Sequence, residues 1–264
     1  MPSYNTTAIV IRRLNYGETD KILTLYSREM GRFTAIAKGA RKTISRLSGA
    51  TELLTCTNFN LATGKTMDVV AQTEVSESFS TMRQDITRLA HGLYFADLVD
   101  HSVEDREPNP VLYDLLFAGM HLIQRGPSPE LIARWFEIQF LGDLGYLPNL
   151  YQCAVCHEDV VAVTGVEREP RYALSASQGA ILCNLHTRAG HVEDHSVLSP
   201  GSLNLLRKLE QIPLAECHNL GEMSIPDAHT LDQTGMALRR YLRYRLEREL
   251  KSLAFIDSLR HAQA

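Results

Sequence analysis

The first 80 residues contain a series of short segments rich in β-branched residues, and this series constrains the fold more than any other feature of the chain. Runs of this kind that end at Gly17, Gly31 and Gly64 predict strands joined by tight turns, the last two as a hairpin around Gly64. About five strands in so short a stretch fit a small closed barrel of the OB type, because closure leaves no strand edge unpaired. The predicted strands lie in residues 8–14, 20–27, 31–39 and, as a longer pair, 57–75.

Beyond Ser80 the apolar residues recur with the period of an α-helix. Pro110 and Pro129 stand at the start of two such segments, where the missing N–H of proline removes no helical hydrogen bond. The pattern stops between residues 148 and 200 and then resumes. The predicted helices cover residues 86–103, 110–124, 129–144, 200–211 and 226 to the end.

Two pairs of metal-ligand residues lie in the interrupted stretch: Cys153 and Cys156, then Cys183 and His186 after 26 intervening residues. Two such knuckles supply four ligands, which close a tetrahedral Zn²⁺ site and leave no position for a reactive water. We therefore predict a structural zinc site, whose binding energy replaces a core that this short stretch cannot build.

Other interpretations of the cysteine residues stay open. Cys153 and Cys156 could be buried thiols in a site that has lost its metal, and His157 or His191 could supply the fourth ligand. A zinc deaminase is excluded, because its H-x-E element precedes its cysteine pair, whereas His191-Val-Glu193 follows the pair here.

Together these patterns predict an α+β multidomain protein. Its N-terminal OB-type β-barrel is followed by an α-helical domain with an inserted zinc-knuckle module. The expected parts are the barrel in 1–80, the first part of the helical domain in 81–147, the zinc module in 148–198 and the last helical part in 199–264.

Charge divides the chain unevenly. The net charge is −4, yet residues 1–50 hold nine Lys and Arg against three acidic residues. Four of these cations, in the segment that follows the third predicted strand, are placed to follow the phosphates of a nucleic acid. The alternative is a solvated loop without a ligand. The four residues are Lys38, Arg41, Lys42 and Arg46.

Aromatic residues alternate with these cations. On an OB barrel, Tyr16, Tyr26 and Phe33 could stack unpaired bases, although Tyr26 and Phe33 could equally fill the barrel core. The arginine-rich segment from Arg239 to Lys251 is interpreted as the solvated face of the last helix.

No motif supports catalysis. Gly64-Lys65-Thr66 resembles the end of a phosphate-binding loop, but Phe59 stands where the first glycine of that loop belongs. No Ser-His-Asp signature and no singular carboxylate pair occurs, so we predict that the protein is not an enzyme. The sequence shows no run of about 18 apolar residues and no leader pattern at its start, so we expect a cytoplasmic protein without a membrane partner.

Several motifs carry a family resemblance that spans nearly the whole chain. Ile-Arg-Arg begins at Ile11, Ala-Lys-Gly-Ala-Arg-Lys at Ala37 and Glu-Asp-Arg-Glu-Pro-Asn-Pro at Glu104. Cys-Ala-Val-Cys begins at Cys153 and Leu-Lys-Ser at Leu250. These segments resemble the RecO family of DNA repair proteins. His186 departs from the final cysteine of four-cysteine members, and some relatives lack the metal.

The resemblance implies binding of single- and double-stranded DNA and annealing of complementary strands. It also implies partnership with RecR and single-stranded-DNA-binding protein to load RecA in RecF-type recombinational repair, near the nucleoid. The DNA-binding residues that it implies are Arg12, Arg13, Lys38, Arg41, Lys42 and Arg46.

Two rival functions remain at this stage. A zinc-dependent nucleic-acid hydrolase would need an open metal position. The second rival is a scaffold whose barrel contacts only proteins, and it would not show the salt dependence that phosphate contacts produce.

Overall fold

The computed structural model describes residues 2–165, 170–189, 194–248 and 250–263. The chain divides into two compact units. The first combines residues 1–124 with 251–264, and the second comprises residues 125–250. Each unit is described by itself.

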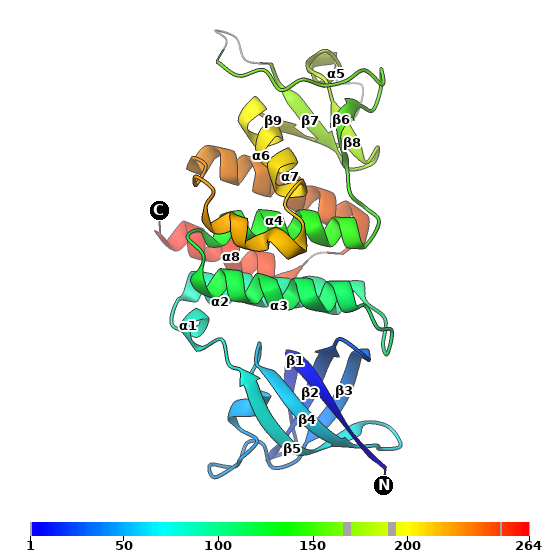
Figure 1. Cartoon of the computed structure of the whole chain (residues 1–264), viewed down its shortest axis with the longest axis vertical. Coiled ribbons are helices and arrows are strands. Elements are labelled where there is room, and N and C mark those ends of the chain that lie inside the picture. The colour runs from blue at the N-terminus through cyan, green and yellow to red at the C-terminus, as the bar shows by residue number, and fades with distance from the viewer. Residues whose placement is uncertain (1, 166–169, 190–193, 249, 264) are drawn as a thin grey trace. The chain divides into compact units, whose positions relative to one another are not determined.

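The first unit begins with a closed five-stranded barrel of strand order β1-β2-β3-β5-β4 (Figure 1). Only β3 and β5 pair in parallel, and the other neighbours are antiparallel. The predicted OB-type barrel is therefore confirmed, as is the hairpin around Gly64. The strands are β1 (Ser3–Tyr16), β2 (Asp20–Ser27), β3 (Gly31–Ala37), β4 (Cys56–Ala62) and β5 (Asp68–Glu77).

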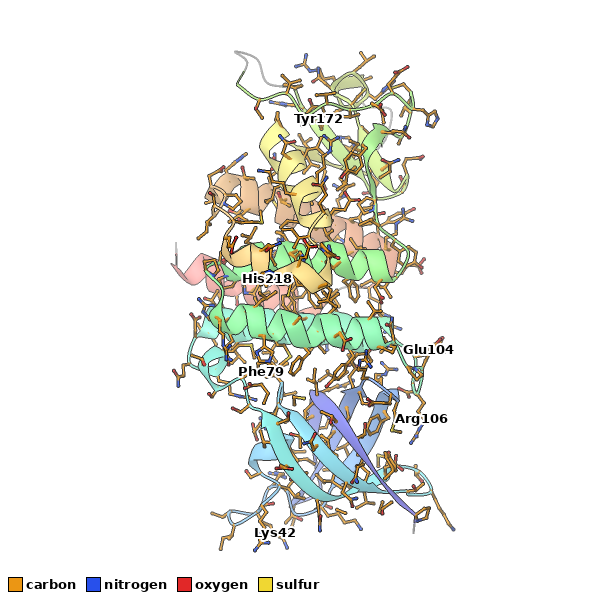
Figure 2. The ribbon with its side chains drawn as sticks, viewed as in Figure 1. Lys42, Phe79, Glu104, Arg106, Tyr172 and His218 are labelled. Atoms are coloured by element: carbon orange, nitrogen blue, oxygen red, sulfur yellow. The ribbon has the colours of Figure 1, made fainter. Side chains whose placement is uncertain are left out.

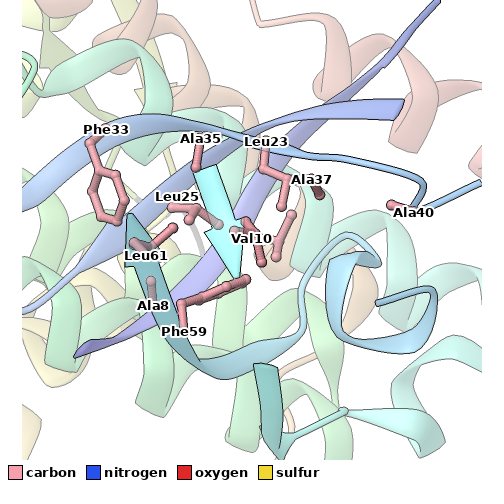
Figure 3. Packing of buried hydrophobic residues seen from close by; sticks show 11 residues of the cluster. Ala8, Val10, Leu23, Leu25, Phe33, Ala35, Ala37, Ala40, Phe59 and Leu61 are labelled. Carbon is pink, nitrogen blue, oxygen red and sulfur yellow. The ribbon is translucent and has the colours of Figure 1, made fainter. Parts of the chain in front are cut away.

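The interior of the barrel is filled by alternate side chains of its strands (Figure 3). Leu23 and Leu25 on β2 face Phe33 and Ala35 on β3, as the two-residue period of a strand requires. A shift of register between Val10 and Arg12 interrupts the pairing of β1 with β2. The buried cluster consists of Ala8, Val10, Leu23, Leu25, Phe33, Ala35, Ala37, Ala40, Phe59, Leu61 and Val70.

Four helices complete the first unit: α1 (Ser80–Arg83), α2 (Ile86–Ser102), α3 (Pro110–Arg125) and α8 (Lys251–Gln263). The side chain of Asp85 caps α2 by accepting from the amides of Thr87 and Arg88. Helix α8 packs on α2 although the two lie far apart in the sequence, so the end of the chain contributes to the unit that its beginning forms.

The segment between α2 and α3 holds the barrel and helices of this unit together. The amide of Arg106 donates to the carbonyl of Arg32 at 2.7 Å, and its guanidinium lies 2.9 Å from the carboxylate of Asp68. The hydroxyl of Tyr4 donates to the same carboxylate at 2.7 Å. The Glu-Asp-Arg-Glu-Pro-Asn-Pro motif from Glu104 therefore has a structural role.

The second unit combines three long helices with a small sheet. The sheet has the order β6-β8-β7-β9. Trp135 of α4 is fully buried, and its indole N–H donates to the carbonyl of Ile212 at 2.8 Å. The elements are α4 (Pro129–Asp143), β6 (Asn149–Cys153), β7 (Tyr172–Ser175), β8 (Ala180–Leu182), α5 (Asn184–Ala189), β9 (His195–Leu198), α6 (Pro200–Glu210), η2 (Leu214–Gly221) and α7 (Ala228–Leu246).

The prediction of one helix from residue 226 to the end is wrong. Helix α7 ends at Leu246, and Glu247 takes a left-handed conformation with a φ of 52°. Helix α8 then begins at Lys251, where the amide and hydroxyl of Ser252 both donate to Asp97 of α2. A contact with a distant residue thus decides where the second helix begins. Within the described residues, no helix combines the length and the apolar character that crossing a membrane requires.

Candidate nucleic-acid interface and metal cluster

Residues 38–47, here called the basic loop, leave β3 as a chain of overlapping turns. Gly39 has a φ of 66°, a conformation that other residues seldom adopt. The amide of Lys42 donates to the carbonyl of Gly39 at 3.1 Å, and that of Ser45 donates to the carbonyl of Lys42 at 3.0 Å. The side chains therefore project from a short, internally bonded backbone.

The turn between β1 and β2 anchors the base of the basic loop. The carboxylate of Asp20 accepts from the amide of Gly39 at 2.8 Å, and Arg41 donates from its amide to Thr19 and from its guanidinium to the carbonyl of Gly17. The Gly39 amide, the Thr19 hydroxyl and the nearby lysines lower the pKa of Asp20. The anchor is thus ionised at neutral pH.

The four cations predicted on the loop are all exposed: Lys38, Arg41, Lys42 and Arg46. Among the described residues, none of them forms an ion pair with a carboxylate. The loop also borders a hollow of about 540 Å³, lined in part by Lys38, Lys42 and the 95% exposed side chain of Ile44. The structure thus brings these four cations together on one exposed segment, in which Figure 2 labels Lys42.

The other two predicted residues, Arg12 and Arg13, do not join this cluster. Successive side chains of a strand point to opposite faces. Arg12 lies 3.9 Å from Asp100 of α2 and is 58% exposed, whereas Arg13 lies 2.5 Å from Glu52. Arg13 therefore already has a close carboxylate partner, while Arg12 keeps much of its surface open.

Glu52 joins two cations and was not singled out by the sequence. Its carboxylate accepts from the buried Lys21 at 3.1 Å as well as from Arg13. Burial on its own raises the pKa of Glu52, but the hydrogen bonds and charges of Lys21 and Arg13 lower it overall. No local pattern could have found this triad, because its members come from β1, β2 and the segment before β4.

Of the three aromatic candidates, one is on the surface. Phe33 is buried in the barrel core, as the alternative to base stacking predicted. Tyr26 is buried as well, but outside the barrel, where its ring lies 6.1 Å from that of Tyr113 on α3. Tyr16 is 53% exposed at the end of β1. A larger hollow of about 610 Å³ over β1, β4 and β5 includes Glu29 and Glu74 in its lining, and these carboxylates would repel phosphates.

The four predicted metal ligands come together in the second unit. Their ligand atoms all lie within 4.8 Å of one another. The Nδ1 atom of His186 is 3.5 Å from the sulfur of Cys153 and 3.2 Å from that of Cys183. The set is completed by Cys156, and it could hold a metal ion.

The surroundings of Cys153 favour its thiolate form. At Cys156, by contrast, the backbone amide of Glu158 lowers the pKa, but desolvation and the neighbouring Cys153 and Cys183 sulfurs raise it overall. The amide of Cys183 donates to the sulfur of Cys153 at 3.3 Å. Burial alone raises the pKa of Cys153, but the backbone amides of Cys156, Cys183 and Val155 lower it to about 6. Since the thiolate is the form that binds metal, this donor set fits a soft or borderline cation.

The sequence left His157 and His191 as alternative fourth ligands. His157 turns the chain after Cys156, with a φ of 61° and an amide that donates to the carbonyl of Cys153, and it is not a member of the cluster. His191 lies outside the described residues. Among the described residues His186 therefore completes the set.

The chain is similar to proteins of one family over its whole length. Residues 1–79 match the family model described as Recombination protein O N terminal, and residues 83–254 match Recombination protein O C terminal. The relative from Pelotomaculum thermopropionicum, a DNA repair protein RecO, is 37% identical over 100% of this chain and 97% of its own length. The protein of the same name from Symbiobacterium thermophilum is 34% identical over 100% of both chains.

Proposed function

Because the chain belongs to the RecO family of DNA repair proteins, we propose that it is a non-catalytic protein that binds DNA and anneals complementary strands in recombinational repair. The observation that carries the proposal is the basic loop. It presents Lys38, Arg41, Lys42 and Arg46 to solvent without a carboxylate partner among the described residues. Unpaired cations on an exposed loop are free to replace the counterions of a phosphate backbone.

Annealing follows from charge neutralisation. Two DNA strands repel one another through their phosphates, and cations that contact both strands at once lower this repulsion. Pairing of the bases then supplies the free energy, so ATP is not required. Arg12, which is half exposed on β1, extends the proposed contact beyond the loop. Arg13 can contribute only by sharing its guanidinium with Glu52.

The test is an annealing assay with two complementary oligonucleotides in the absence of ATP. Arg41→Glu with Lys42→Glu should slow annealing roughly tenfold or more. The fold should stay intact, because both side chains are exposed and the loop keeps its backbone anchors to Thr19 and Asp20 when the exposed hydrogen bond from Arg41 to Gly17 is lost. The matched control, Lys208→Glu with Lys251→Glu, makes the same change of net charge at exposed lysines outside the loop. Unchanged annealing by the loop variant would sink the assignment of the loop to DNA.

Salt dependence separates DNA binding from a scaffold that contacts only proteins. If about six phosphates of a single strand are contacted, log K should fall against log salt with a slope of roughly −4. The loop variant removes about two contacts and should reduce the slope to roughly −3. A response that is flat in the unchanged protein would favour the scaffold.

We also propose that the cluster of Cys153, Cys156, Cys183 and His186 binds Zn²⁺ as a structural ion. Three thiolates and one imidazole give the ligand set of closed tetrahedral sites. A bound zinc would supply no chemistry beyond holding β6, β8 and α5 together, and this argues against the zinc-dependent hydrolase, which needs an open position.

Elemental analysis tests the zinc site. The purified chain should carry about one zinc ion, and Cys153→Ser should lose it and unfold at a lower temperature. Cys217→Ser is the control, because Cys217 is a half-buried thiol outside the cluster. A folded protein without zinc, or equal zinc in Cys153→Ser, contradicts the proposal.

The family resemblance supports the remaining parts of the proposal. These are action with RecR and single-stranded-DNA-binding protein to load RecA, and a location with the nucleoid in the cytoplasm. Pull-down of RecR and of single-stranded-DNA-binding protein by the purified chain tests the two partners. Residues 51–264, which include the long helices, hold 18 Lys and Arg against 28 acidic residues, and this excess of negative charge suits protein partners better than phosphates.

A further inference from the structure

The second unit carries an aromatic and basic surface at the end of α7. The guanidinium of Arg245 lies 5.8 Å from the ring centre of Tyr146, 5.1 Å from that of Tyr241 and 5.7 Å from that of Tyr244. Each distance is short enough for attraction between the cation and the ring. No carboxylate among the described residues pairs with Arg245, so the rings are its main partners.

The backbone is built to hold Arg245 in this position. The hydroxyl of Tyr241 donates to the carbonyl of Tyr146 at 2.9 Å, and the Tyr241 ring is buried. Gly179, with a φ of 66°, approaches so closely that a Cβ atom there would lie 2.5 Å from Nη2 of Arg245. Three parts of the unit therefore hold Arg245 in place: α7, the segment after α4 and the turn before β8.

Two rings of this group remain open to solvent. Tyr146 is 42% exposed and Tyr244 is 47% exposed, and Leu147 beside them is 41% exposed. Arg243 is exposed in the last turn of α7, and Arg248 is exposed two residues beyond the end of the helix at Leu246. Cations in the last turn of a helix also suit its dipole, but the dipole gives no reason for exposed rings beside them.

We propose that Tyr146 and Tyr244, with Arg245 and the exposed Arg248, form a second single-stranded nucleic-acid site, separate from the basic loop. A single strand offers flat bases and a negative charge at every nucleotide, and this surface offers exposed rings alternating with guanidinium groups. An acidic peptide would satisfy the arginines but would leave the rings without planar partners. One chain would then hold DNA at a site in each unit, and strands to be annealed would meet on one molecule.

Photochemical crosslinking tests the contact directly. A single-stranded oligonucleotide that carries 5-iododeoxyuridine is irradiated with the full chain, and the adducts are mapped by mass spectrometry. We expect adducts at Tyr146 or Tyr244, and an excess of unlabelled strand should remove them. Adducts confined to the first unit, for example to Tyr16, would overturn the proposal.

Affinity measurements test how much the rings of Tyr146 and Tyr244 contribute to the binding of a single strand. In a chain that already carries Arg41→Glu and Lys42→Glu, Tyr146→Ala with Tyr244→Ala should weaken the remaining binding of an oligothymidylate roughly tenfold. Tyr146→Phe with Tyr244→Phe keeps both rings and should stay within about twofold of the parent. If the two tyrosines had only a structural role, the alanine pair and the phenylalanine pair would bind the oligothymidylate equally well whenever both variants are folded and stable.

The same variants separate this proposal from the proposed function. If the loop variant alone abolishes all DNA binding, the second site is refuted and the basic loop stands. If the alanine pair loses binding of an acidic peptide but keeps binding of the oligonucleotide, the surface serves a protein partner and the second site is likewise refuted.

Discussion

Asp68 shows how a single carboxylate joins the barrel to the segment before α3. Burial by itself raises its pKa, but the hydrogen bonds from Tyr4, Arg106 and the amide of Gly64 lower it overall. A carboxylate whose pKa is lower in the folded chain stabilises the fold above its ordinary pKa of about 3.9, and this stabilisation is lost as the pH falls through the lowered value.

We therefore expect Asp68→Asn to reduce the free energy of unfolding by about 1–3 kcal/mol at neutral pH, since three donors lose an ionised acceptor. Urea titrations at neutral pH and near pH 3 measure the effect. The difference between variant and parent should shrink at the acid pH, because the carboxylate of the unfolded parent becomes protonated there and the lowered pKa of the folded carboxylate then contributes less stability. A difference that is equal at both pH values contradicts the account.

Gly31 illustrates a close approach that only the folded chain reveals. Its φ is 65°, and a Cβ atom there would lie 2.0 Å from the backbone oxygen of Glu107. Gly17 has a similar φ of 55°, but nothing lies within 4 Å of its Cβ position. A side chain would strain the left-handed backbone at both glycines, but only at Gly31 would its Cβ atom also clash with a neighbouring backbone atom.

Gly17→Ala should therefore cost about 1 kcal/mol of stability, the strain of a left-handed residue. Gly31→Ala should cost clearly more, because the backbone of residue 107 has to move away from β3. Chemical denaturation of both variants measures the two losses. Equal losses would mean that the Glu107 contact relaxes without cost.

Among the elements, α8 depends on its contact with α2. The hydroxyl of Ser252 donates to Asp97 at 2.6 Å and its amide donates at 3.2 Å. Sequence periodicity extended the preceding helix through this point, because a change of partner leaves no mark on the hydrophobic pattern. The Leu-Lys-Ser motif at residue 250 is explained by this contact.

Ser252→Ala should destabilise the first unit by about 1 kcal/mol, the usual net value of one hydrogen bond. Ser258→Ala on the same helix is the matched control, since its hydroxyl is exposed and donates only to the carbonyl of Phe255. Thermal unfolding followed by circular dichroism compares the two. If Ser258→Ala lowers the unfolding temperature as much as Ser252→Ala does, the loss reflects helix propensity and not the packing of α8 on α2.

At the scale of the whole molecule, the two ends of the chain meet in one unit, and the middle of the chain forms the other. The single tryptophan, Trp135, is buried in the second unit. Its fluorescence therefore follows the unfolding of the second unit, while circular dichroism follows both. A change that circular dichroism detects without a matching change in fluorescence is therefore assigned to the first unit.

Truncation after Leu250 removes α8 and should lower the transition that circular dichroism detects. The Trp135 fluorescence transition should move little, because α8 belongs to the first unit. Denaturation followed by both signals makes the comparison. If both transitions shift together by the same amount, the units do not unfold separately.

Local sequence patterns predicted the strands of the barrel, the helices in 86–103, 110–124, 129–144 and 200–211, the basic loop and the four Cys and His side chains that cluster. Each of these depends on patterns among neighbouring residues: a period of two or of 3.6, a glycine at a turn, or cation and ligand spacing. Such patterns survive in the folded chain because local geometry produces them.

Which charged side chains remain available to a ligand depends on how the chain folds. Arg12 and Arg13 are adjacent in sequence, yet one lies near Asp100 and the other pairs with Glu52. The tertiary structure also placed α8 in the first unit and gathered three tyrosines around Arg245. Partners far apart in the sequence are brought together by packing, and no local period records that event.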